Sequence, residues 1–266
     1  MRIAVSILVI YLSLCALLYL FQRKLEYLPS GELKKPEAYK LYEFSVEILP
    51  SYDGTELALW YKKPKDEQKE ILVFFHGNAG NLGDRADKLE MLARYTGYGI
   101  AALSYRGYPG SQGKPSEEAF IKDAEWLIKY LETQGYEKEN IVLYGESLGT
   151  ALAIKLAAQF EVKALILEAP FWSALEVAKQ SYWYIPLELL MKDKYESFKH
   201  IKSIKSPTLF IHGTADNVTP VEHSRRLYLR MHMPLKKKLE VEGAGHIEFD
   251  NYFLVKQVTS FIAEQQ

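Results

Sequence analysis

The stretch IVLYGESLGTALAIKL, residues 141–156, joins an apolar strand pattern to an Ala- and Leu-rich helical pattern through Gly-Glu-Ser-Leu-Gly. Ser147 therefore falls at the joint, and Gly145 and Gly149 flank it two residues away on each side. A turn tight enough to lift a serine clear of a sheet forces an unfavourable backbone conformation. Glycines at the flanking positions remove side chains that would collide with the neighbouring strand and helix. The pattern predicts a nucleophile elbow, with the serine presented at the carboxyl end of a strand.

Strand and helix patterns alternate on both sides of this turn. Apolar strands are expected at 71–75, 99–105, 141–145, 163–169 and 208–213, and another strand at 237–243. Helices are expected at 84–96, 117–133, 148–159, 221–231 and from about 249. Strands at 42–49 and 55–63 flank Asp53-Gly54, a hairpin signal. The fold class is therefore α/β: a mostly parallel sheet with helices on both faces and an antiparallel hairpin at its leading edge.

The composition bounds the class of protein. The chain has 266 residues, of which 48% are hydrophobic, and a formal net charge of −1, which fits one domain with a substantial core. Neither charge is in excess, so nothing indicates a nucleic-acid partner. Cys15 is the single cysteine and has no partner for an internal disulfide. No histidine pair has metal-ligand spacing, and we expect no metal and no cofactor.

The N-terminal segment is apolar enough to cross a membrane. Residues 3–21 contain no charge, and as a helix they would span about 28 Å, close to the hydrocarbon thickness of a bilayer. The run ends in Phe21-Gln22-Arg23-Lys24 without a small-residue cleavage site. The sequence favours an uncleaved single-pass anchor over residues 1–24. A cleaved signal peptide and a buried core helix are the alternatives.

The side of the membrane that residues 25–266 face stays open. Arg2 and the amino terminus flank one end of the apolar run, whereas Arg23, Lys24, Lys34 and Lys35 flank the other. The positive-inside rule therefore favours a cytoplasmic body. A short basic N-terminus before an apolar run also begins exported domains, so the charge count does not decide the matter.

A serine hydroxyl needs a base to take its proton and an acid to orient that base. His246 lies in GAGH after the last expected strand, and Asp216 follows the preceding strand in HGTADNVTP. The chain order Ser147, Asp216, His246 is the order that a nucleophile elbow of this kind uses. Glu168, at the end of the strand before residues 171–206, is the rival acid. His76, His200, His212, His223 and His232 are expected to be structural or surface residues.

The oxyanion that forms when a serine attacks a carbonyl needs two preorganised donors. The backbone N–H of Leu148, directly after the nucleophile, is one expected donor. The loop after the 71–75 strand reads HGNAGN, and its Asn78 backbone N–H is the second. Glycines 77 and 80 allow that loop to curl towards the site, although a plain tight turn would also use them.

Taken together, these motifs resemble one branch of the α/β-hydrolases, the membrane-anchored ABHD-type or bud-emergence-like serine hydrolases. The stretches that carry the resemblance, in chain order, are HGNAGN (76–81), SYRGYPGSQGKPSE (104–117), GESLG (145–149), LEAPF (167–171), HGTADNVTP (212–220) and GAGH (243–246). The resemblance covers about residues 40–262. It implies serine hydrolase chemistry on esters, thioesters or acyl lipids. Relatives that remove palmitoyl groups from proteins carry an N-terminal cysteine cluster, which Cys15 alone does not match.

Two features of the resemblance concern substrate binding. The 171–206 segment lies where the α/β-hydrolase fold carries its lid, and at this length it should form a small cap. Its large apolar residues would line an acyl pocket or merely cover the end of the sheet: Phe171, Trp172 and Trp183 as the main candidates, with Tyr182, Tyr184 and Ile185 beside them. Arg106, in the Tyr-Arg-Gly loop, is expected to tie down neighbouring carbonyls, with a contact to a polar or phosphate headgroup as the alternative.

The sequence thus predicts a membrane-anchored serine hydrolase that cleaves carboxylic esters or thioesters, with an acyl-ester or acyl-lipid substrate. A serine nucleophile excludes the aspartate-based dehalogenase and epoxide-hydrolase chemistry of this fold. A serine peptidase on the same triad and a non-catalytic, membrane-tethered binding protein remain as alternatives. Preference for amides over matched esters would indicate the former, and failure to react with acyl-serine reagents the latter.

Overall fold

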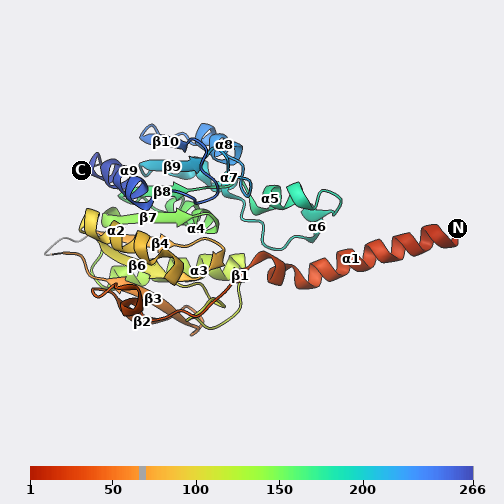
Figure 1. Ribbon diagram of the computed structural model, residues 1–266, viewed down its shortest axis with the longest axis horizontal. Coiled ribbons are helices and arrows are strands. Elements are labelled where there is room, and N and C mark those ends of the chain that lie inside the picture. Colours follow the sequence, from red (N-terminus) through yellow and green to blue (C-terminus); the bar gives the residue numbers. More distant parts are fainter. Residues whose placement is uncertain (66–69, 266) are drawn as a thin grey trace.

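The computed structural model describes residues 1–65 and 70–265, and an eight-stranded sheet forms its centre (Figure 1). Across the sheet the strands lie in the order β10-β9-β8-β7-β4-β6-β3-β2. These strands are β2 (Ser45–Pro50), β3 (Glu56–Lys62), β4 (Ile71–Phe75), β6 (Gly99–Leu103), β7 (Ile141–Glu146), β8 (Ala164–Glu168), β9 (Thr208–Gly213) and β10 (Lys236–Val241). From β10 to β6 all neighbours are parallel, whereas β2–β3 and β3–β6 are antiparallel. The mostly parallel sheet and its leading hairpin are as predicted.

Helices cover both faces of the sheet. The helices are α2 (Ala86–Thr96), α3 (Glu117–Thr133), α4 (Leu148–Ala157), α8 (Glu222–Arg230) and α9 (Asn251–Ala263). Apolar residues of α3, α4 and α8 pack on one face, and those of α2 and α9 pack on the other. Strands β4, β7 and β8 are buried along their whole length, which explains their continuous apolar sequences.

The segment between β8 and β9 carries only short helices. These are α5 (Ala174–Ser181), α6 (Leu187–Leu190), α7 (Ser197–His200) and the 3₁₀ turn η4 (Ile201–Ser203). In Figure 1, α5 and α6 project from the sheet on the side from which the N-terminal helix leaves. We refer to residues 171–206 as the lid segment.

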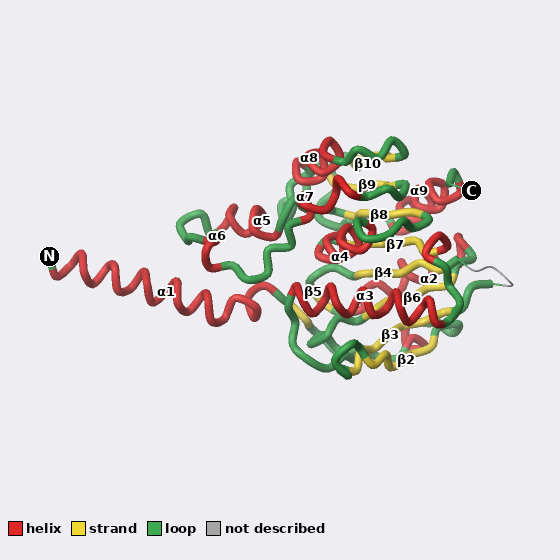
Figure 2. The backbone as a smooth tube through the Cα atoms, turned by 180° about the vertical axis from the view of Figure 1, so that it is seen from behind, coloured by secondary structure: helices red, strands yellow, loops and turns green. Residues whose placement is uncertain are grey.

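Helix α1 (Arg2–Glu26) projects far beyond the rest of the molecule (Figure 2). Among its residues only Cys15 is buried, and by length and apolar composition the helix could cross a membrane. Directly after it, β1 (Leu28–Pro29) pairs with β5 (Ala79–Gly80), which follows the carboxyl end of β4. The C-terminal end of α1 is therefore fixed at the sheet edge where the expected active-site loops lie.

The remaining short elements complete the loops. They are the 3₁₀ turns η1 (Pro36–Tyr39), η2 (Leu82–Arg85) and η3 (Lys138–Asn140). Turn η2 runs directly into α2, and its capping box joins the Asn81 and Asp84 side chains to each other's backbone N–H groups. This box fixes the entry to α2 just beyond the HGNAGN loop.

Candidate active site

The turn between β7 and α4 has the strained geometry that the glycine spacing predicts. Ser147 has φ +49° and ψ −112°, a combination that L-residues rarely adopt. A Cβ on Gly149 would lie 2.0 Å from the Phe75 carbonyl oxygen, and one on Gly145 would lie 2.6 Å from the Gly149 carbonyl oxygen. Only glycine fits at either position, because backbone atoms block both.

The structure brings Ser147, His246 and Asp216 together. Ser147 Oγ lies 2.9 Å from His246 Nε2, and His246 Nδ1 lies 2.7 Å from Asp216 Oδ2. The three residues come from three loops, after β7, β9 and β10, which all end at the same edge of the parallel sheet. Ser147 and His246 are 99 residues apart in the sequence, and the parallel strands bring them together at one edge of the sheet.

Asp216 is buried and saturated with donors. Its Oδ1 accepts the N–H groups of Val218 at 2.9 Å and Thr219 at 2.7 Å, while its Oδ2 also lies 3.2 Å from His212 Nε2. Burial by itself would raise the pKa of Asp216, but the donors from His212, His246 and Thr219 outweigh it and the pKa is lowered. Because the carboxylate is ionised, it accepts the His246 Nδ1–H, and Nε2 is left to accept the serine proton.

Glu168, the rival acid, has different partners. Both of its carboxylate oxygens lie 2.8 Å from Lys88 Nζ, and Tyr144 Oη donates to it at 2.5 Å. Its side chain is fully buried at the end of β8, beneath the elbow, and has no contact with His246. The geometry therefore places Asp216, and not Glu168, behind the histidine.

A buried ion cluster beneath the elbow escaped the sequence reasoning. Glu146, the residue before the serine, accepts the Gly77 N–H at 3.1 Å, pairs with Arg85 at 2.8 Å and accepts from Lys88 at 2.8 Å. Burial alone would raise the pKa of Glu146, but Lys88 and Arg85 lower it. Glu146 thereby links the nucleophile turn to the HGNAGN loop. The available signal was an acid at the variable position of G-x-S-x-G, together with two cations at 85 and 88 shortly after the HGNAGN loop.

The two expected oxyanion donors lie beside the serine. Asn78, Ser147 and Leu148 line the same pocket. Leu148 is the first residue of α4, so its N–H has no acceptor within the helix. Tyr108 Oη donates to the Asn78 carbonyl at 2.6 Å and lies 2.9 Å from its Oδ1, which fixes the orientation of this residue.

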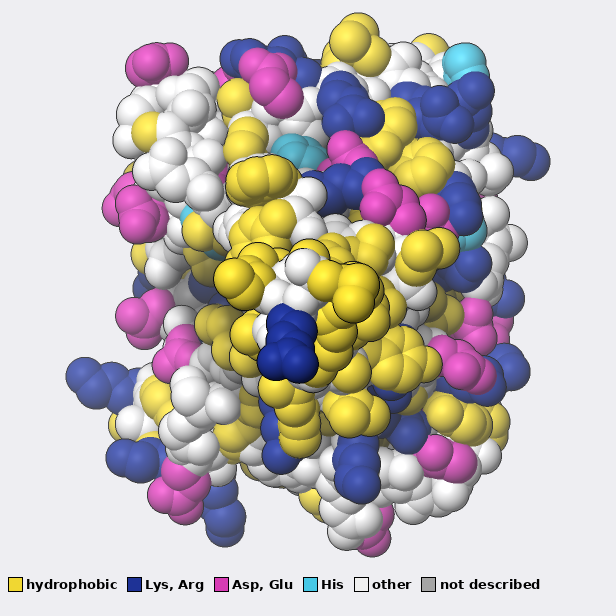
Figure 3. Space-filling view, turned by 90° about the vertical axis from the view of Figure 1, so that its right-hand side faces the viewer, with side chains coloured by type: hydrophobic (Ala, Val, Ile, Leu, Met, Phe, Trp, Pro, Cys, Tyr) yellow, Lys and Arg dark blue, Asp and Glu magenta, His cyan; other side chains and the backbone are white. Residues whose placement is uncertain are grey.

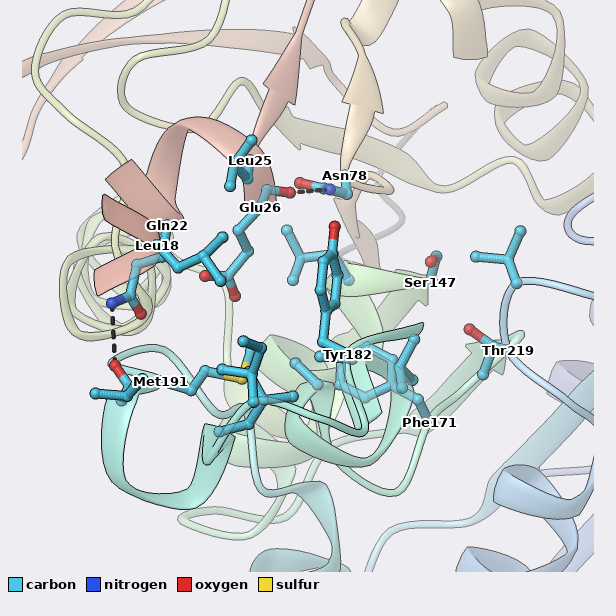
Figure 4. A pocket seen from close by; sticks show the side chains of 18 of the residues that line it. Leu18, Gln22, Leu25, Glu26, Asn78, Ser147, Phe171, Tyr182, Met191 and Thr219 are labelled. Carbon is cyan, nitrogen blue, oxygen red and sulfur yellow. Dashed lines mark hydrogen bonds between the residues drawn. The ribbon is translucent and has the colours of Figure 1, made fainter. Parts of the chain in front are cut away.

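The pocket next to Ser147 has a volume of about 310 Å³ and mostly apolar walls (Figure 4). Phe171 lines it, as expected, but Trp172 and Trp183 do not. Trp172 instead stacks on Phe198, with ring centroids 5.0 Å apart, and Arg226 covers its other side. Trp183 is 79% exposed on the outside of the lid segment. Tyr182 and Ile185 line it as well, whereas Val177 and Met191 of the lid segment are wall residues that the sequence reasoning missed.

Arg106 and His76 both make contacts that stabilise the fold. Arg106 pairs with both Asp123 oxygens at 2.5 and 2.6 Å and with Asp53 at 2.9 Å, so it ties its loop to α3 and to the β2–β3 turn. His76 is fully buried, stacks on Tyr105 and bonds the Gly77 carbonyl at 2.7 Å. Within residues 1–65 and 70–265, no group of three or more His, Cys, Asp or Glu side chains could hold a metal ion.

Sequence and fold together define the class as an α/β hydrolase. Residues 70–195 match the family model described as the alpha/beta hydrolase fold. The chain is 33% identical over 218 residues to the human alpha/beta hydrolase domain-containing protein 17B, covering 80% of this chain and 73% of the human protein. This chain belongs to the α/β-hydrolase superfamily, to its ABHD type, and its family supports hydrolase activity in general.

Other relatives extend the likeness over most of the chain. An uncharacterised protein of Mycobacterium tuberculosis is 32% identical over 249 residues, covering 91% of this chain and 88% of that protein. Among solved structures, the Pyrococcus furiosus esterase Pf2001 matches with a TM-score of 0.73 at 19% identity, over 90% of this chain and 98% of the esterase. At that identity the structural likeness supports the fold alone.

Proposed function

We propose that this protein is a membrane-anchored serine hydrolase that cleaves carboxylic ester or thioester bonds of acyl substrates. The observation that carries the proposal is the position of the His246 imidazole, whose nitrogens lie 2.9 Å from Ser147 Oγ and 2.7 Å from Asp216 Oδ2. A nucleophile, a base and an ionised orienting group in this geometry make up a catalytic triad.

The proposed reaction has two halves. Ser147 Oγ attacks the acyl carbonyl while His246 Nε2 takes its proton, and the N–H groups of Asn78 and Leu148 stabilise the oxyanion. The imidazolium, stabilised by Asp216, then protonates the departing alcohol or thiol, and an acyl-serine remains. Water deprotonated by His246 attacks the acyl-serine, and His246 returns this proton to Ser147 Oγ as the carboxylic acid leaves.

The pocket favours an acyl substrate over a peptide. Its walls are largely leucine, isoleucine, valine and aromatic side chains, which bind a hydrocarbon chain by removing it from water. We assign residues 1–24 to the anchor, residues 25–266 to the hydrolase domain and 171–206 to its lid. Helix α1 supports the anchor assignment through its length of 25 residues and its exposed apolar surface.

Labelling with a fluorophosphonate probe tests the proposal directly. We expect the wild-type protein in detergent micelles to label, Ser147→Ala to be unreactive, and Ser203→Ala, an exposed serine outside the site, to label as the wild type does. Chain-length series of p-nitrophenyl esters, thioesters and matched amides then define the bond that is cleaved. An unreactive, folded wild-type protein would favour a binding protein, and faster turnover of amides would favour a peptidase.

A further inference from the structure

We propose that helix α1 is a wall of the acyl-binding pocket as well as an anchor, so that the substrate is an amphiphile whose acyl chain enters Ser147's pocket directly from the bilayer. This inference rests on the proposed function and names its substrate class: membrane-resident acyl lipids rather than water-soluble esters. Five observations support it: three concern the contacts of α1 with the pocket, the lid segment and the HGNAGN loop, and two concern the placement of α1 and the lid in the bilayer.

One side of the C-terminal half of α1 faces the pocket. Leu18, Tyr19, Gln22, Leu25 and Glu26 line it, a spacing that places them on one side of a helix. Figure 4 shows Leu18, Leu25 and Glu26 across the pocket from Phe171 and Thr219, with Tyr182 between them. Without α1 the pocket would have no wall on this side.

The opposite wall is the lid segment, and hydrogen bonds fasten it to α1. The Gln22 side chain donates to the Leu190 carbonyl at 3.0 Å and accepts the Lys192 N–H at 2.7 Å, so it bridges two backbone groups of the lid. Arg23 donates to both oxygens of Asp193 at 2.7 and 3.1 Å. These contacts hold α1 and the lid segment as two sides of one channel.

The last turn of α1 also touches the catalytic loop. Asn78 Nδ2 donates to the Glu26 carbonyl, and β1, which follows immediately, pairs with β5 in the HGNAGN loop. The Glu26 side chain points into the pocket, and its Oε1 is buried without a hydrogen-bond partner. The last turn of α1 and the two expected oxyanion donors therefore line one and the same pocket.

The position of the apolar run sets the depth of the channel entrance. Residues 3–21 carry no charge and extend about 28 Å as a helix, so they occupy the hydrocarbon layer. Leu18 and Tyr19, which line the pocket, lie within this run, about 3 to 5 Å from its end. The outer part of the pocket consequently lies at the hydrocarbon boundary, where the ester carbonyls of lipids begin.

The surface around α1 fits the same placement. Figure 3 looks at the molecule from the α1 side: apolar side chains gather around the helix and most charged side chains lie farther out. On the lid segment Trp183 and Leu189 are 79% and 83% exposed, and Tyr182 and Tyr184 are exposed beside them. Aromatic residues of this kind are typical of the membrane–water interface, so the lid rests on the bilayer next to α1.

A matched pair of substitutions on α1 tests the channel. Leu18→Trp places bulk in the pocket, whereas Leu20→Trp makes the same change two residues away, on a side chain 68% exposed outside it. In phosphatidylcholine vesicles we expect Leu18→Trp to lower kcat/KM for 4-methylumbelliferyl palmitate at least tenfold more than it lowers kcat/KM for p-nitrophenyl acetate, whose acyl group is too short to reach Leu18. Leu20→Trp should leave both within twofold.

The outcomes separate this inference from the proposed function. Unchanged palmitate hydrolysis by Leu18→Trp, or an equal loss on both esters, would overturn the channel while esterase activity persists. A wild type inactive on all esters would instead contradict the proposed function. The channel is then judged by binding of dansyl-undecanoic acid to Ser147→Ala. We expect adding Leu18→Trp to weaken that binding at least tenfold, and unchanged binding would overturn the inference. If Leu18→Trp does not fold, Leu18→Ala takes its place. This variant should shift the acyl chain length at which ester hydrolysis is fastest, and an unshifted optimum would contradict the inference.

Discussion

At the scale of single residues, partners decide which of two buried acids orients the histidine. Asp216 and Glu168 lie at the ends of adjacent strands, and both are buried. Asp216 faces backbone N–H groups and two imidazoles, so it stays ionised without a neighbouring Lys or Arg. Glu168 is committed to Lys88 and Tyr144. Only Asp216 therefore has a carboxylate oxygen that can accept the Nδ1–H of His246.

His76 gives the folded protein a defined sensitivity to acid. Burial, and then the charge of Arg85, lower the pKa of His76 to about 3, whereas an unfolded chain has a histidine pKa near 6.5. Between these values the unfolded state binds a proton that the folded state excludes. The free energy of unfolding is therefore unaffected by protonation of His76 above pH 6.5. Below that pH it falls by about 1.4 kcal/mol per pH unit until the pH reaches about 3.

We therefore expect His76→Asn, which keeps a donor for the Gly77 carbonyl, to have a shallower loss of stability between pH 6 and 4 than the wild type. Urea-unfolding midpoints of the full-length protein in micelles at several pH values measure this slope. His232→Asn, at an exposed histidine, is the control and should match the wild-type slope. Equal slopes for His76→Asn and the wild type would contradict the prediction.

At the scale of elements, the ordered packing of the lid depends on α1. The lid segment has short helices of four to eight residues, which are marginal on their own. Asp193 of the lid segment contacts two residues at the C-terminal end of α1. It pairs with Arg23, in the last turn of the helix, and accepts a hydrogen bond from Oη of Tyr27, the residue directly after the helix, at 3.1 Å. Tyr27 Oη also lies 2.7 Å from Tyr195 Oη. A buried carboxylate thus connects the N-terminal element to the lid.

We expect Asp193→Ala to raise the rate of proteolysis within 171–206 about tenfold, since hydrogen bonds to charged groups contribute about 1.5–3 kcal/mol. Limited trypsinolysis of the protein in micelles, with mass spectrometry of the cut sites, measures the change. Glu196→Gln is the matched control, because Glu196 pairs with Lys199 inside the lid and not with α1. A lid that is cut equally in the wild type and in Asp193→Ala would refute the connection.

The sequence predicted the elements of the sheet well for a physical reason. Parallel strands buried on both faces are continuous apolar runs, and β4 and β9 match their predicted ranges of 71–75 and 208–213. The glycine spacing around Ser147 followed from local sterics, and the histidine and aspartate followed from chain order. Glu146, by contrast, pairs with Arg85 of η2 and Lys88 of α2, about 60 residues earlier in the chain, and no local pattern shows which distant residues will pair.

The residues that line the pocket were predicted less well than the side chains that lie together around His246. Aromatic composition identified the lid segment, but Trp172 and Trp183 lie outside the pocket and Phe171 inside it. Which side of an irregular segment faces inward depends on the elements packed against it, and here one of these is α1, more than 140 residues earlier in the chain. Such a contact has no period that a sequence could display.

At the scale of the whole molecule, α1 and the loops that carry Asn78 and Ser147 lie at the same end of the sheet. Apolar side chains gather around α1 on the face seen in Figure 3, and β1 connects α1 to β5, which follows the carboxyl end of β4. In water such a surface would favour aggregation, whereas in a bilayer it is buried. With α1 as the proposed anchor, the site would face the lipid because α1 lines its pocket.

We expect the full-length protein to stay in the membrane pellet after alkaline carbonate extraction. Leu8→Arg combined with Leu12→Arg should release it, because each arginine near the middle of a span costs about 2.5–3.5 kcal/mol. The matched control, Leu8→Ala with Leu12→Ala, retains an uncharged helix and should stay in the pellet. Intact mass measurement of the extracted wild type checks that the helix is still attached. A wild-type protein that extracts into the supernatant, or that lacks the first 24 residues, would contradict the anchor, and a truncated mass would specifically indicate a cleaved signal peptide.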